Sequence, residues 1–281
     1  MTSVLITGGS GAFGTACAKR LLGLGANRIV IFSRGEHRQA EMARAIPDPD
    51  QRLRFFIGDV RDRERLRRAM EGIEVVIHAA ALKRIEVGAY NPLEVMKTNI
   101  FGSANVIEAS HDAGVETVVA LSSDKAFEPI SPYGTSKAFA ESLFLAADGS
   151  RGAMGPKFSV VRYGNVWGST GSVVPTWRSI LASSDTVPVT DPECTRFYMT
   201  MSEAVDLVLK TAKSSPGGTI AIPALPAYRL GDLAEAMGAK MNIIGLPVYE
   251  KLHESMAVGN SSDKARRMSV AELKSILNGD T

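Results

Sequence analysis

Cysteine, histidine and net charge are all scarce in this sequence of 281 residues. Its two cysteines, Cys17 and Cys194, lie far apart and lack the spacing of metal ligands, and its four histidines form no ligand cluster. We therefore expect reduced thiols, no metal site and a cytoplasmic location. The formal net charge is only +2, which gives no electrostatic basis for binding nucleic acid.

Long hydrophobic runs are also absent. The most apolar stretch, residues 73–82, is interrupted by Glu74 and His78 and is too short to span a bilayer. The N-terminus passes directly into a strand-like run over residues 3–7, without the basic and apolar regions of a signal peptide. We expect no association with a membrane.

Short β-branched runs alternate with helical stretches as far as residue 165. This alternation is typical of βαβ units around a parallel sheet, whose covered faces explain apolar runs such as residues 118–121. We predict an α/β protein with a Rossmann-type doubly wound parallel sheet. The expected strands are residues 4–7, 28–32, 54–57, 75–78, 117–121 and 158–162. The expected helices are residues 12–24, 36–45, 63–71, 93–113 and 133–147.

Glycine and proline become frequent after residue 165. Helical patterns remain over residues 202–213 and 230–237 and in a polar tail over residues 262–278. We predict a dinucleotide-binding Rossmann domain over residues 1–165 and a smaller substrate-binding lobe over residues 166–281. This lobe should close over the carboxyl edge of the sheet, and chain segments can cross between the two.

A glycine motif with the spacing G-x-x-G-x-x-G follows the first expected strand and opens the first helix. Gly8, Gly11 and Gly14 suit a tight turn, close approach of the backbone to a pyrophosphate, and helix–strand packing. The helix N-terminus adds free N–H groups. This context predicts an NAD(P) site, to which we also assign the intervening Ser10, Ala12 and Phe13.

The end of the second strand bears on the choice of cofactor. An NAD site usually has Asp or Glu there, whereas this chain has Ser33 and Arg34, with Arg38 close by. These residues suit a 2′-phosphate and favour NADP, although Glu36 keeps NAD open. We also expect Asp59 to accept a hydrogen bond from the adenine amino group. The remaining residues expected beside the cofactor are Val60, Ala79, Ala80 and Ala81.

Tyr133 and Lys137 form a Tyr-x-x-x-Lys pattern, whose spacing places both side chains on one face of a helix. The lysine ammonium and a positive nicotinamide ring lower the tyrosine pKa. The phenolate can then take a proton from a substrate alcohol while the cofactor takes a hydride. Ser122 and Ser123 lie at the end of the fifth strand, where a hydroxyl can bind the substrate oxygen, and we assign Ser123 to the catalytic set. Together with the glycine motif, these residues predict a redox site, with Tyr133 and Lys137 also contacting the cofactor.

These features resemble the extended short-chain dehydrogenase/reductase superfamily, which mostly acts on nucleotide sugars. The stretch Ser123-Asp124-Lys125-Ala126 narrows the resemblance, because its Thr-Asp-Lys-Ala form is typical of inverting UDP-N-acetylglucosamine 4,6-dehydratases and their relatives in capsule biosynthesis. The resemblance covers nearly the whole chain. Other matching stretches are residues 56–62, 78–83, 90–92, 97–99, 162–166, 171–175, 195–197 and 250–254.

The resemblance implies an NADP-dependent reaction on a UDP-sugar, with UDP-N-acetylglucosamine as the expected substrate. Hydride leaves C4 while Tyr133 removes the hydroxyl proton, and the new ketone acidifies the C5 hydrogen. Lys125 takes that proton, provided its neighbours lower its pKa toward neutrality, and a protonated Asp124 donates to the departing C6 hydroxyl. Hydride returns to C6, and reprotonation on the other face inverts C5. The structural alternative for Asp124 and Lys125 is a surface ion pair.

The same resemblance implies a set of substrate contacts. Asn165 and Arg196 are expected near the diphosphate, and the segment that begins with Ser172 and Val173 near the uracil. Two further substrate-binding residues are Lys83, toward the sugar or its phosphates, and Glu250. The structural alternatives are a turn cap for Asn165 and a packed surface position for Arg196.

The chain departs from the family pattern before its Glu-Lys-Leu-His-Glu stretch. The family usually has Arg-Pro-Gly there, whereas this chain has Pro247-Val248-Tyr249. The missing arginine removes an expected diphosphate contact, for which Arg229 is a candidate replacement. At Ser123 the chain has serine in place of threonine, which keeps the hydroxyl.

Two other functions stay open. A UDP-sugar epimerase, or a dehydratase that stops at the 5,6-alkene, would also keep Tyr133 and Lys137. A non-catalytic NADP-sensing protein on the same fold is a further alternative, but such proteins commonly lose the tyrosine or the lysine. The family resemblance also implies a homo-oligomer.

Overall fold

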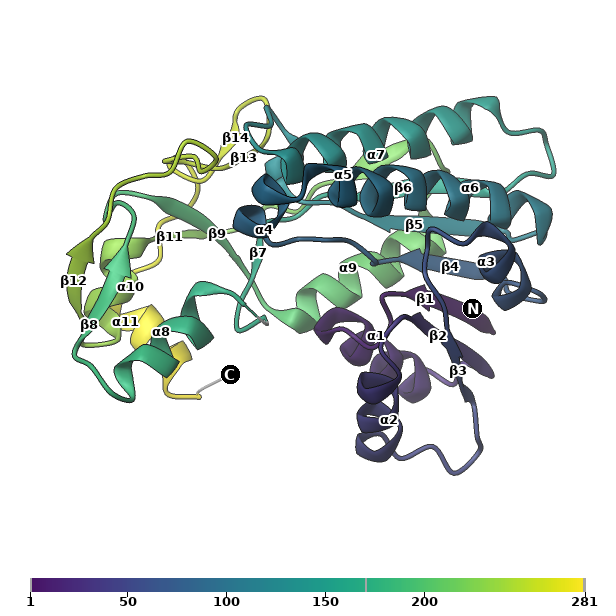
Figure 1. Cartoon of the computed structure of the whole chain (residues 1–281), viewed down its shortest axis with the longest axis horizontal. Helices are drawn as coiled ribbons and strands as arrows, with labels where there is room; N and C mark the ends of the chain where they lie inside the picture. The colour runs from purple at the N-terminus through teal and green to yellow at the C-terminus, as the bar shows by residue number, and fades with distance from the viewer. Residues whose placement is uncertain (1, 170, 280–281) are drawn as a thin grey trace.

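A seven-stranded parallel sheet forms the centre of the larger part of the molecule (Figure 1), in a computed structural model that describes residues 2–169 and 171–279. Its strand order is β10-β6-β5-β4-β1-β2-β3. The chain winds outward from β1 to β3 and then crosses back to β4, so the order reverses beside β1, where ligands of such sheets bind. The strands are β1 (Ser3–Thr7), β2 (Arg28–Ser33), β3 (Leu53–Ile57), β4 (Val75–His78), β5 (Thr117–Leu121), β6 (Lys157–Val161) and β10 (Thr219–Ala221). This confirms the predicted doubly wound α/β fold.

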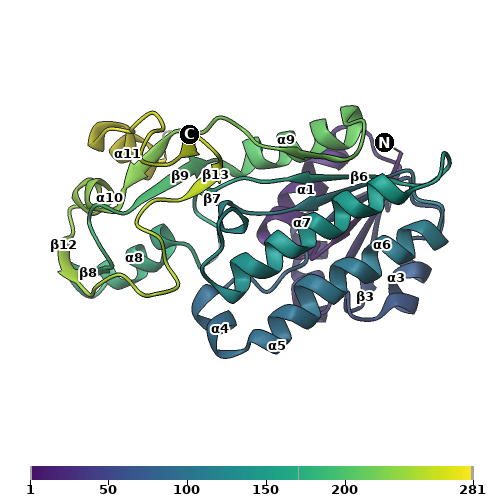
Figure 2. The same ribbon diagram turned by 90° about the horizontal axis from the view of Figure 1, so that it is seen from above.

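Helices cover both faces of the sheet, which is why its strands are apolar on both sides. In β1, Val4 and Ile6 pack into one core and the intervening Leu5 into the other, and all three are fully buried. The first core is closed by α1 (Ala12–Gly23), α2 (Glu36–Ala45) and α9 (Met201–Ser214). The second is closed by α3 (Arg63–Ala69), α6 (Gly102–Asp112) and α7 (Pro132–Ser150). Figure 2 shows α6 and α7 side by side on this second face.

The smaller part of the molecule lies beside the sheet and has its own core (Figures 1 and 2). Trp177, Tyr228 and Leu233 are buried at its centre. Its strands are β7 (Asn165–Val166), β8 (Thr186–Val189), β9 (Thr195–Met199), β11 (Ala227–Arg229), β12 (Lys240–Ile243), β13 (Ser255–Ala257) and β14 (Asn260–Ser261). Its helices are α8 (Val173–Leu181), α10 (Leu230–Ala236) and α11 (Val270–Leu277).

The chain crosses between the two parts more than once. After β9 it returns to the sheet, where α9 packs on α1 and β10 pairs with β6. It then enters the smaller part again at β11. The division at residue 165 stays a prediction.

Two helical predictions differ from the structure, and some helices were not predicted. The helix expected over residues 93–113 is interrupted: α5 (Pro92–Val95) leads into a π-helical turn, η1 (Met96–Phe101), before α6. Asn99 in this turn bonds to both backbone polar groups of Leu82, at 2.8 and 3.0 Å, and π turns allow such inward placement. Two additional helices, α4 (Ile85–Tyr90) and α8, were not predicted.

The tail expected to be helical over residues 262–278 is helical only in α11. The preceding backbone pairs elsewhere: Ser262 N–H donates to the Glu254 carbonyl, and Met268 N–H to the Ala227 carbonyl. A capping box made by Ser269 and Glu272 then starts the helix. Throughout residues 2–169 and 171–279, the helices fall short of the length and apolar character needed to cross a bilayer.

Candidate active site

The turn after β1 has the geometry of a phosphate cradle. Gly8 has a φ of +66°, and a Cβ there would come within 2.9 Å of the Ala80 backbone, so glycine is required. Gly14 packs on Gly9, whose carbonyl a side chain would overlap. α1 begins after Gly11 with no side-chain cap, which leaves N–H groups of its first turn for an anion. These features fit the pyrophosphate of a dinucleotide.

Two hydroxyl groups meet where the glycine turn faces the end of β2. Ser10 Oγ and Ser33 Oγ lie 2.9 Å apart. The buried Gln39 side chain on α2 donates to Ser33 Oγ and to the Phe56 carbonyl, each at 2.9 Å. Gln39 therefore fixes the Ser33 hydroxyl, a role that sequence reasoning missed because the only sign was an amide on the buried face of a helix.

The arginines assigned to a 2′-phosphate lie next to this hydroxyl pair in the chain. Arg34 directly follows β2, and its Nη1 lies 3.8 Å from Asp59 Oδ2. Arg38 is exposed on the first turn of α2. Both side chains face solvent, so they can turn toward a bound phosphate without breaking a buried contact.

Asp59 is occupied by a neighbouring arginine. Its carboxylate accepts from the backbone N–H of Arg61 at 3.0 Å and from Arg61 Nη2 at 2.7 Å. Burial opposes ionisation, but the Arg61 hydrogen bonds and charge, with that of Arg34, hold the Asp59 pKa below its usual value. Val60 points into the core, and its carbonyl accepts from Asn105. The adenine contact of Asp59 stays a prediction.

β4 ends at a buried histidine that stays neutral. His78 contacts the hydroxyls of Thr7 at 2.8 Å and Ser103 at 3.2 Å through its two ring nitrogens. Burial lowers its pKa to about 3. The small residues 79–81 that follow are only partly buried and begin beside the glycine turn, which leaves their backbone open to a ligand.

The first two turns of α7 carry the expected redox pair. Ser131 caps the helix by accepting from Gly134 N–H at 3.1 Å, and Pro132 occupies its first position. Tyr133 and Lys137 are both buried, and Lys137 Nζ donates to the Leu121 carbonyl at the end of β5. Burial lowers the pKa of Lys137 to about 8.

The electrostatics of Tyr133 differ from the expectation. We expected the Lys137 ammonium to lower its pKa. In the structure burial raises the Tyr133 pKa, and the groups that oppose this rise are Lys125 and the Ser123 hydroxyl. The pKa of Tyr133, expected to act in oxidation at C4, thus depends on Lys125, expected to act in elimination.

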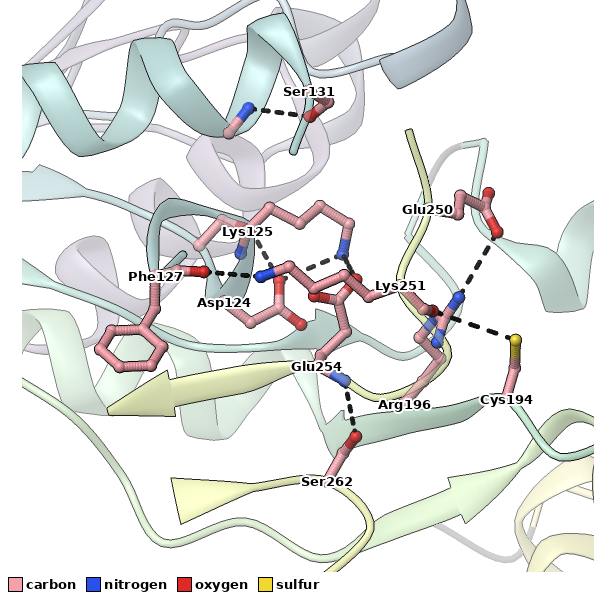
Figure 3. Close-up of polar contacts among 12 residues, drawn as sticks. Asp124, Lys125, Phe127, Ser131, Cys194, Arg196, Glu250, Lys251, Glu254 and Ser262 are labelled. Carbon is pink, nitrogen blue, oxygen red and sulfur yellow. Dashed lines mark hydrogen bonds and ion pairs between the residues drawn. The ribbon is translucent and has the colours of Figure 1, made fainter. Parts of the chain in front are cut away.

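Asp124, Lys125 and Glu254 form one buried cluster (Figure 3). The first two lie on a 3₁₀ turn after β5, η2 (Asp124–Ala126), which Ser123 caps. Lys125 Nζ lies 3.1 Å from Asp124 Oδ1 and 3.1 Å from Glu254 Oε1. Only 1% of the Asp124 side chain and 3% of the Glu254 side chain are exposed. This excludes the surface ion pair that was the structural alternative.

The charges within this cluster shift the pKa of Asp124 in the expected direction and the pKa of Lys125 in the opposite direction to the one expected. Burial, reinforced by the Glu254 charge, raises the pKa of Asp124, the direction that an acid requires. Burial alone would lower the pKa of Lys125, but Asp124 and Glu254 together raise it. We had expected neighbours to lower it. Glu254 keeps a lowered pKa, because Lys125 and Arg196 outweigh its burial.

Comparison with known proteins assigns the family. The chain matches the family described as polysaccharide biosynthesis protein over residues 4–274. It belongs to this family. A relative from Campylobacter jejuni, named UDP-N-acetylglucosamine 4,6-dehydratase (inverting), is 44% identical over 264 residues, which cover 92% of this chain and 78% of the relative.

Two further proteins are similar to this chain over nearly its whole length. A Rickettsia rickettsii protein named UDP-glucose 4-epimerase is 37% identical over 273 residues, covering 94% of this chain and 80% of the relative. The crystal structure of Pen from Bacillus thuringiensis superposes with a TM-score of 0.94 at 33% identity, covering 99% of this chain and 97% of that one. The relatives of this chain thus carry names for two different reactions, a 4,6-dehydratase and a 4-epimerase.

Three of the residues that the family resemblance assigns to substrate have polar groups suited to a ligand. Asn165 Oδ1 and Ser172 Oγ are buried without a hydrogen-bond partner among the described residues, which is unusual unless a ligand or water satisfies them. Arg196 is buried rather than on the surface. Its Nη1 donates to the Thr195 carbonyl at 2.9 Å, and its Nη2 lies 3.4 Å from Glu250 Oε2.

The other assigned residues are placed less tightly. Val173 is partly buried at the start of α8, and Lys83 is exposed, although nearby protein lowers the Lys83 pKa by partial desolvation. Arg229 is not a free replacement for the missing arginine. It is bound to Asp232 at 2.8 Å and to Glu193 at 3.0 Å.

Glu254 is the cluster residue that sequence reasoning missed. The Glu-Lys-Leu-His-Glu stretch was recognised, but its first glutamate, Glu250, was assigned to the substrate and its last to nothing. The structure pairs Glu250 with Arg196, and Glu254 with Lys125. The stretch itself was the available signal. Choosing between its two glutamates needs the path of the chain after β12.

Proposed function

We propose that this protein is an NADP-dependent hydro-lyase that converts UDP-N-acetylglucosamine to a 4-keto-6-deoxy product and inverts C5. One observation carries the proposal: a buried acid, Asp124, and a partly buried amine, Lys125, lie 3.1 Å apart next to Tyr133 of the redox pair. Oxidation or epimerisation at C4 needs only the redox pair. Elimination of the C6 hydroxyl also needs a base for C5 and an acid for the leaving oxygen.

The redox half-reaction is assigned to α7. When bound at the glycine turn, the nicotinamide cofactor supplies the hydride acceptor and later the hydride donor. Tyr133 takes the proton of the C4 hydroxyl, and Lys137 holds the helix turn against the end of β5 through the Leu121 carbonyl. Ser123, beside Tyr133, is placed to bind the same substrate oxygen.

The elimination half-reaction is assigned to the cluster. Moving one proton from Lys125 Nζ to Asp124 across 3.1 Å turns the ion pair into an amine and a carboxylic acid. The amine then takes the C5 proton while the acid protonates the C6 oxygen, which leaves as water, and the ion pair is restored. After hydride reaches C6, Lys125 returns a proton to C5. The proton that Tyr133 took from the C4 hydroxyl then replaces the one that Asp124 lost, and Ser123 Oγ, 2.8 Å from Asp124 Oδ1, connects the two.

The product formed in deuterated water tests this proposal. We expect UDP-N-acetylglucosamine to give a 4-keto-6-deoxy sugar with deuterium at C5 and the inverted configuration, measured by mass spectrometry and NMR. Lys125→Ala should lose this product by at least about 100-fold, because the C5 base is gone. Bound NADP without turnover of any UDP-sugar would contradict the proposal, as would a product that retains the C5 configuration.

A UDP-sugar 4-epimerase is the second candidate, because the Rickettsia relative at 37% identity carries that name. This reaction uses Tyr133 and Lys137 and leaves Asp124 and Lys125 without a role. A 4-epimer without solvent deuterium would establish it, and Lys125→Ala would then keep most of its activity. A product that stops at the 5,6-alkene would instead indicate a 5,6-dehydratase.

We further propose NADP over NAD, on the basis of Ser33, Arg34 and Arg38, and a homo-oligomer in the cytoplasm. The exposed apolar side chains of Tyr90 and Leu93, which are 88% and 64% exposed, support a further protein contact. The two buried free cysteines are compatible with a reducing compartment. Light scattering coupled to gel filtration would measure the oligomeric state.

A further inference from the structure

Glu254 reaches the cluster from a distant segment of the chain. It lies between β12 and β13, more than a hundred residues after Lys125 in the sequence. Its carboxylate and that of Asp124 lie at equal distances of 3.1 Å from Lys125 Nζ. Figure 3 shows the Lys125 amine joined by dashed lines to both carboxylates. The amine is thus held by two carboxylates at once.

The Glu254 backbone is fixed by a single buried residue. Ser262 Oγ accepts from Glu254 N–H at 2.9 Å, and Ser262 N–H donates to the Glu254 carbonyl at 2.8 Å. Ser262 is fully buried and bonds in turn to Thr195 Oγ1 at 2.6 Å. Such a double backbone anchor leaves the carboxylate little freedom other than rotation of its own side chain.

The segment around Glu254 is also tied to the turn that carries Lys125. Lys251 Nζ donates to the Phe127 carbonyl at 2.6 Å, directly after η2. The Leu252 carbonyl accepts from Thr195 N–H at 2.9 Å. The segment is thus tied both to the residue after η2 and to β9, so the distance between Glu254 and Lys125 is set by the fold.

We propose that Glu254 is a positioning residue for the elimination step: it holds Lys125 Nζ beside Asp124 and stabilises the ammonium that forms when Lys125 takes the C5 proton. This inference rests on the proposed function. The ion pair of Glu254 is with Lys125 Nζ, so we assign its effect to that amine. Its Oε2 atom is buried without a partner among the described residues, and the charges of Lys125 and then Arg196 hold its pKa below the usual value.

The chemistry explains why two carboxyl groups are needed around one amine. During elimination Asp124 gives its proton to the leaving oxygen, so it cannot be the constant counter-charge of Lys125 throughout the step. A second carboxylate that stays ionised balances the ammonium while Asp124 changes its protonation state. A single Asp–Lys pair would have to perform both tasks with one carboxyl group.

The isosteric variant Glu254→Gln tests the inference. We expect elimination to slow by at least about tenfold, with KM nearly unchanged and oxidation at C4 retained. Reduced cofactor should therefore accumulate during turnover. The reactive Asp124–Lys125 pair carries one proton, so the ascending limb of the kcat–pH profile reports loss of a second proton from the pair. Because the Glu254 charge raises the pKa of both Asp124 and Lys125, its removal should shift this limb to lower pH. A purely structural defect would lower both half-reactions and leave this limb in place, and that result would overturn the inference.

A readout independent of turnover separates this inference from the proposed function. Competitive acetylation across pH, read by mass spectrometry, reports the pKa of Lys125 in the resting protein, and we expect a lower value in Glu254→Gln. An unchanged Lys125 profile would reject the inference even if the enzyme proves to be a dehydratase. A wild-type protein that makes no C5-deuterated product would reject the proposed function instead.

Two further variants complete the design. Glu193→Gln removes an exposed carboxylate of an ion pair in the smaller part, and it should leave kcat and the Lys125 profile unchanged. Glu254→Asp keeps the charge but shortens its reach, so we expect a normal limb position with slower elimination. If Glu254→Gln fails to fold, the Asp variant still decides: elimination at the wild-type rate would overturn the inference.

Discussion

At the scale of single residues, burial sets the behaviour of Lys137. Its pKa falls from 10.5 to about 8 because desolvation outweighs the opposing charge of Glu141. Below pH 8 the folded protein holds a buried ammonium at a cost in stability. Between pH 8 and 10.5 only the unfolded state still binds this proton, so the contribution of Lys137 to stability rises with pH.

Replacement of Lys137 by methionine should therefore separate stability from activity. We expect Lys137→Met to raise the free energy of unfolding at pH 7 by about 1–3 kcal/mol, and the gain to disappear above pH 10.5, where the wild-type amine is neutral in both states. Oxidation of substrate should fall by at least about 100-fold. Urea denaturation at both pH values and an assay of cofactor reduction measure this. Lys19→Met, on the exposed side of α1, is the control. A lower free energy of unfolding in Lys137→Met than in the wild-type protein would contradict the argument.

The residues that could be predicted share one strand–turn–helix unit. The five predicted catalytic residues lie between residues 123 and 137. Spacing indicated Tyr133 and Lys137, whereas the family resemblance implied Asp124 and Lys125. Glu254 and Gln39 could not be found in the same way. Glu254 reaches Lys125 only through the path of the smaller part, and Gln39 acts through contacts with the ends of β2 and β3.

At the scale of elements, a buried ion pair joins α7 to three other segments. Arg162 directly follows β6, and its Nε donates to Glu141 Oε1 on α7 at 2.9 Å. Its Nη1 donates to the Met256 carbonyl in β13, and its guanidinium lies 5.8 Å from the centre of the Phe127 ring after η2. One residue thus connects the helix of the redox pair to the segment of Glu254.

Breaking this pair on one side should be much more harmful than replacing both partners. We expect Glu141→Leu to lower the free energy of unfolding by about 3–5 kcal/mol, because it leaves a buried guanidinium unpaired, and the added Arg162→Met to recover most of the loss. Urea denaturation of the single and double variants measures this. Asp206→Asn, which removes an ion pair with Arg20 that is half exposed, should cost less than about 1 kcal/mol. A double variant no more stable than Glu141→Leu would contradict the argument.

Elements were predictable where the pattern is local and buried. The six expected strands of the sheet all exist, because continuous apolar runs bounded by turns identify strands covered on both faces. The π turn at η1 was not predictable, since its helical pattern continues without a break and the deviation is explained by the contact of Asn99 with Leu82. The tail before α11 was not predictable either, because its backbone bonds to β11 and to Glu254.

At the scale of the whole molecule, the candidate site is assembled from both parts. The sheet contributes the glycine turn, η2 and α7, whereas the smaller part contributes Arg196 and Glu254. The topology of the smaller part could not be read from the sequence, because β7, β9 and β11 pair across long separations. The cofactor cradle could be predicted because it occupies one turn after β1. Its contacts are local in the sequence, whereas those of the smaller part join residues far apart in the chain.

Cofactor choice should be visible in the stability of the whole fold, because a ligand that binds only the native state stabilises it by mass action. If Arg34 and Arg38 bind a 2′-phosphate, NADP⁺ should bind at least about tenfold more tightly than NAD⁺, a difference of about 1.4 kcal/mol in unfolding free energy at equal, saturating concentrations. The double variant Arg34→Leu with Arg38→Leu should erase this difference and leave stabilisation by NAD⁺ unchanged, since the pyrophosphate cradle is intact. Arg67→Leu on the exposed face of α3 is the matched control. Equal stabilisation of the wild-type protein by both cofactors would mean that the end of β2 does not select NADP. A preference for NADP⁺ that survives in the double variant would assign the 2′-phosphate to other residues. Ser10 and Ser33, whose hydroxyls lie 2.9 Å apart, would then be tested next.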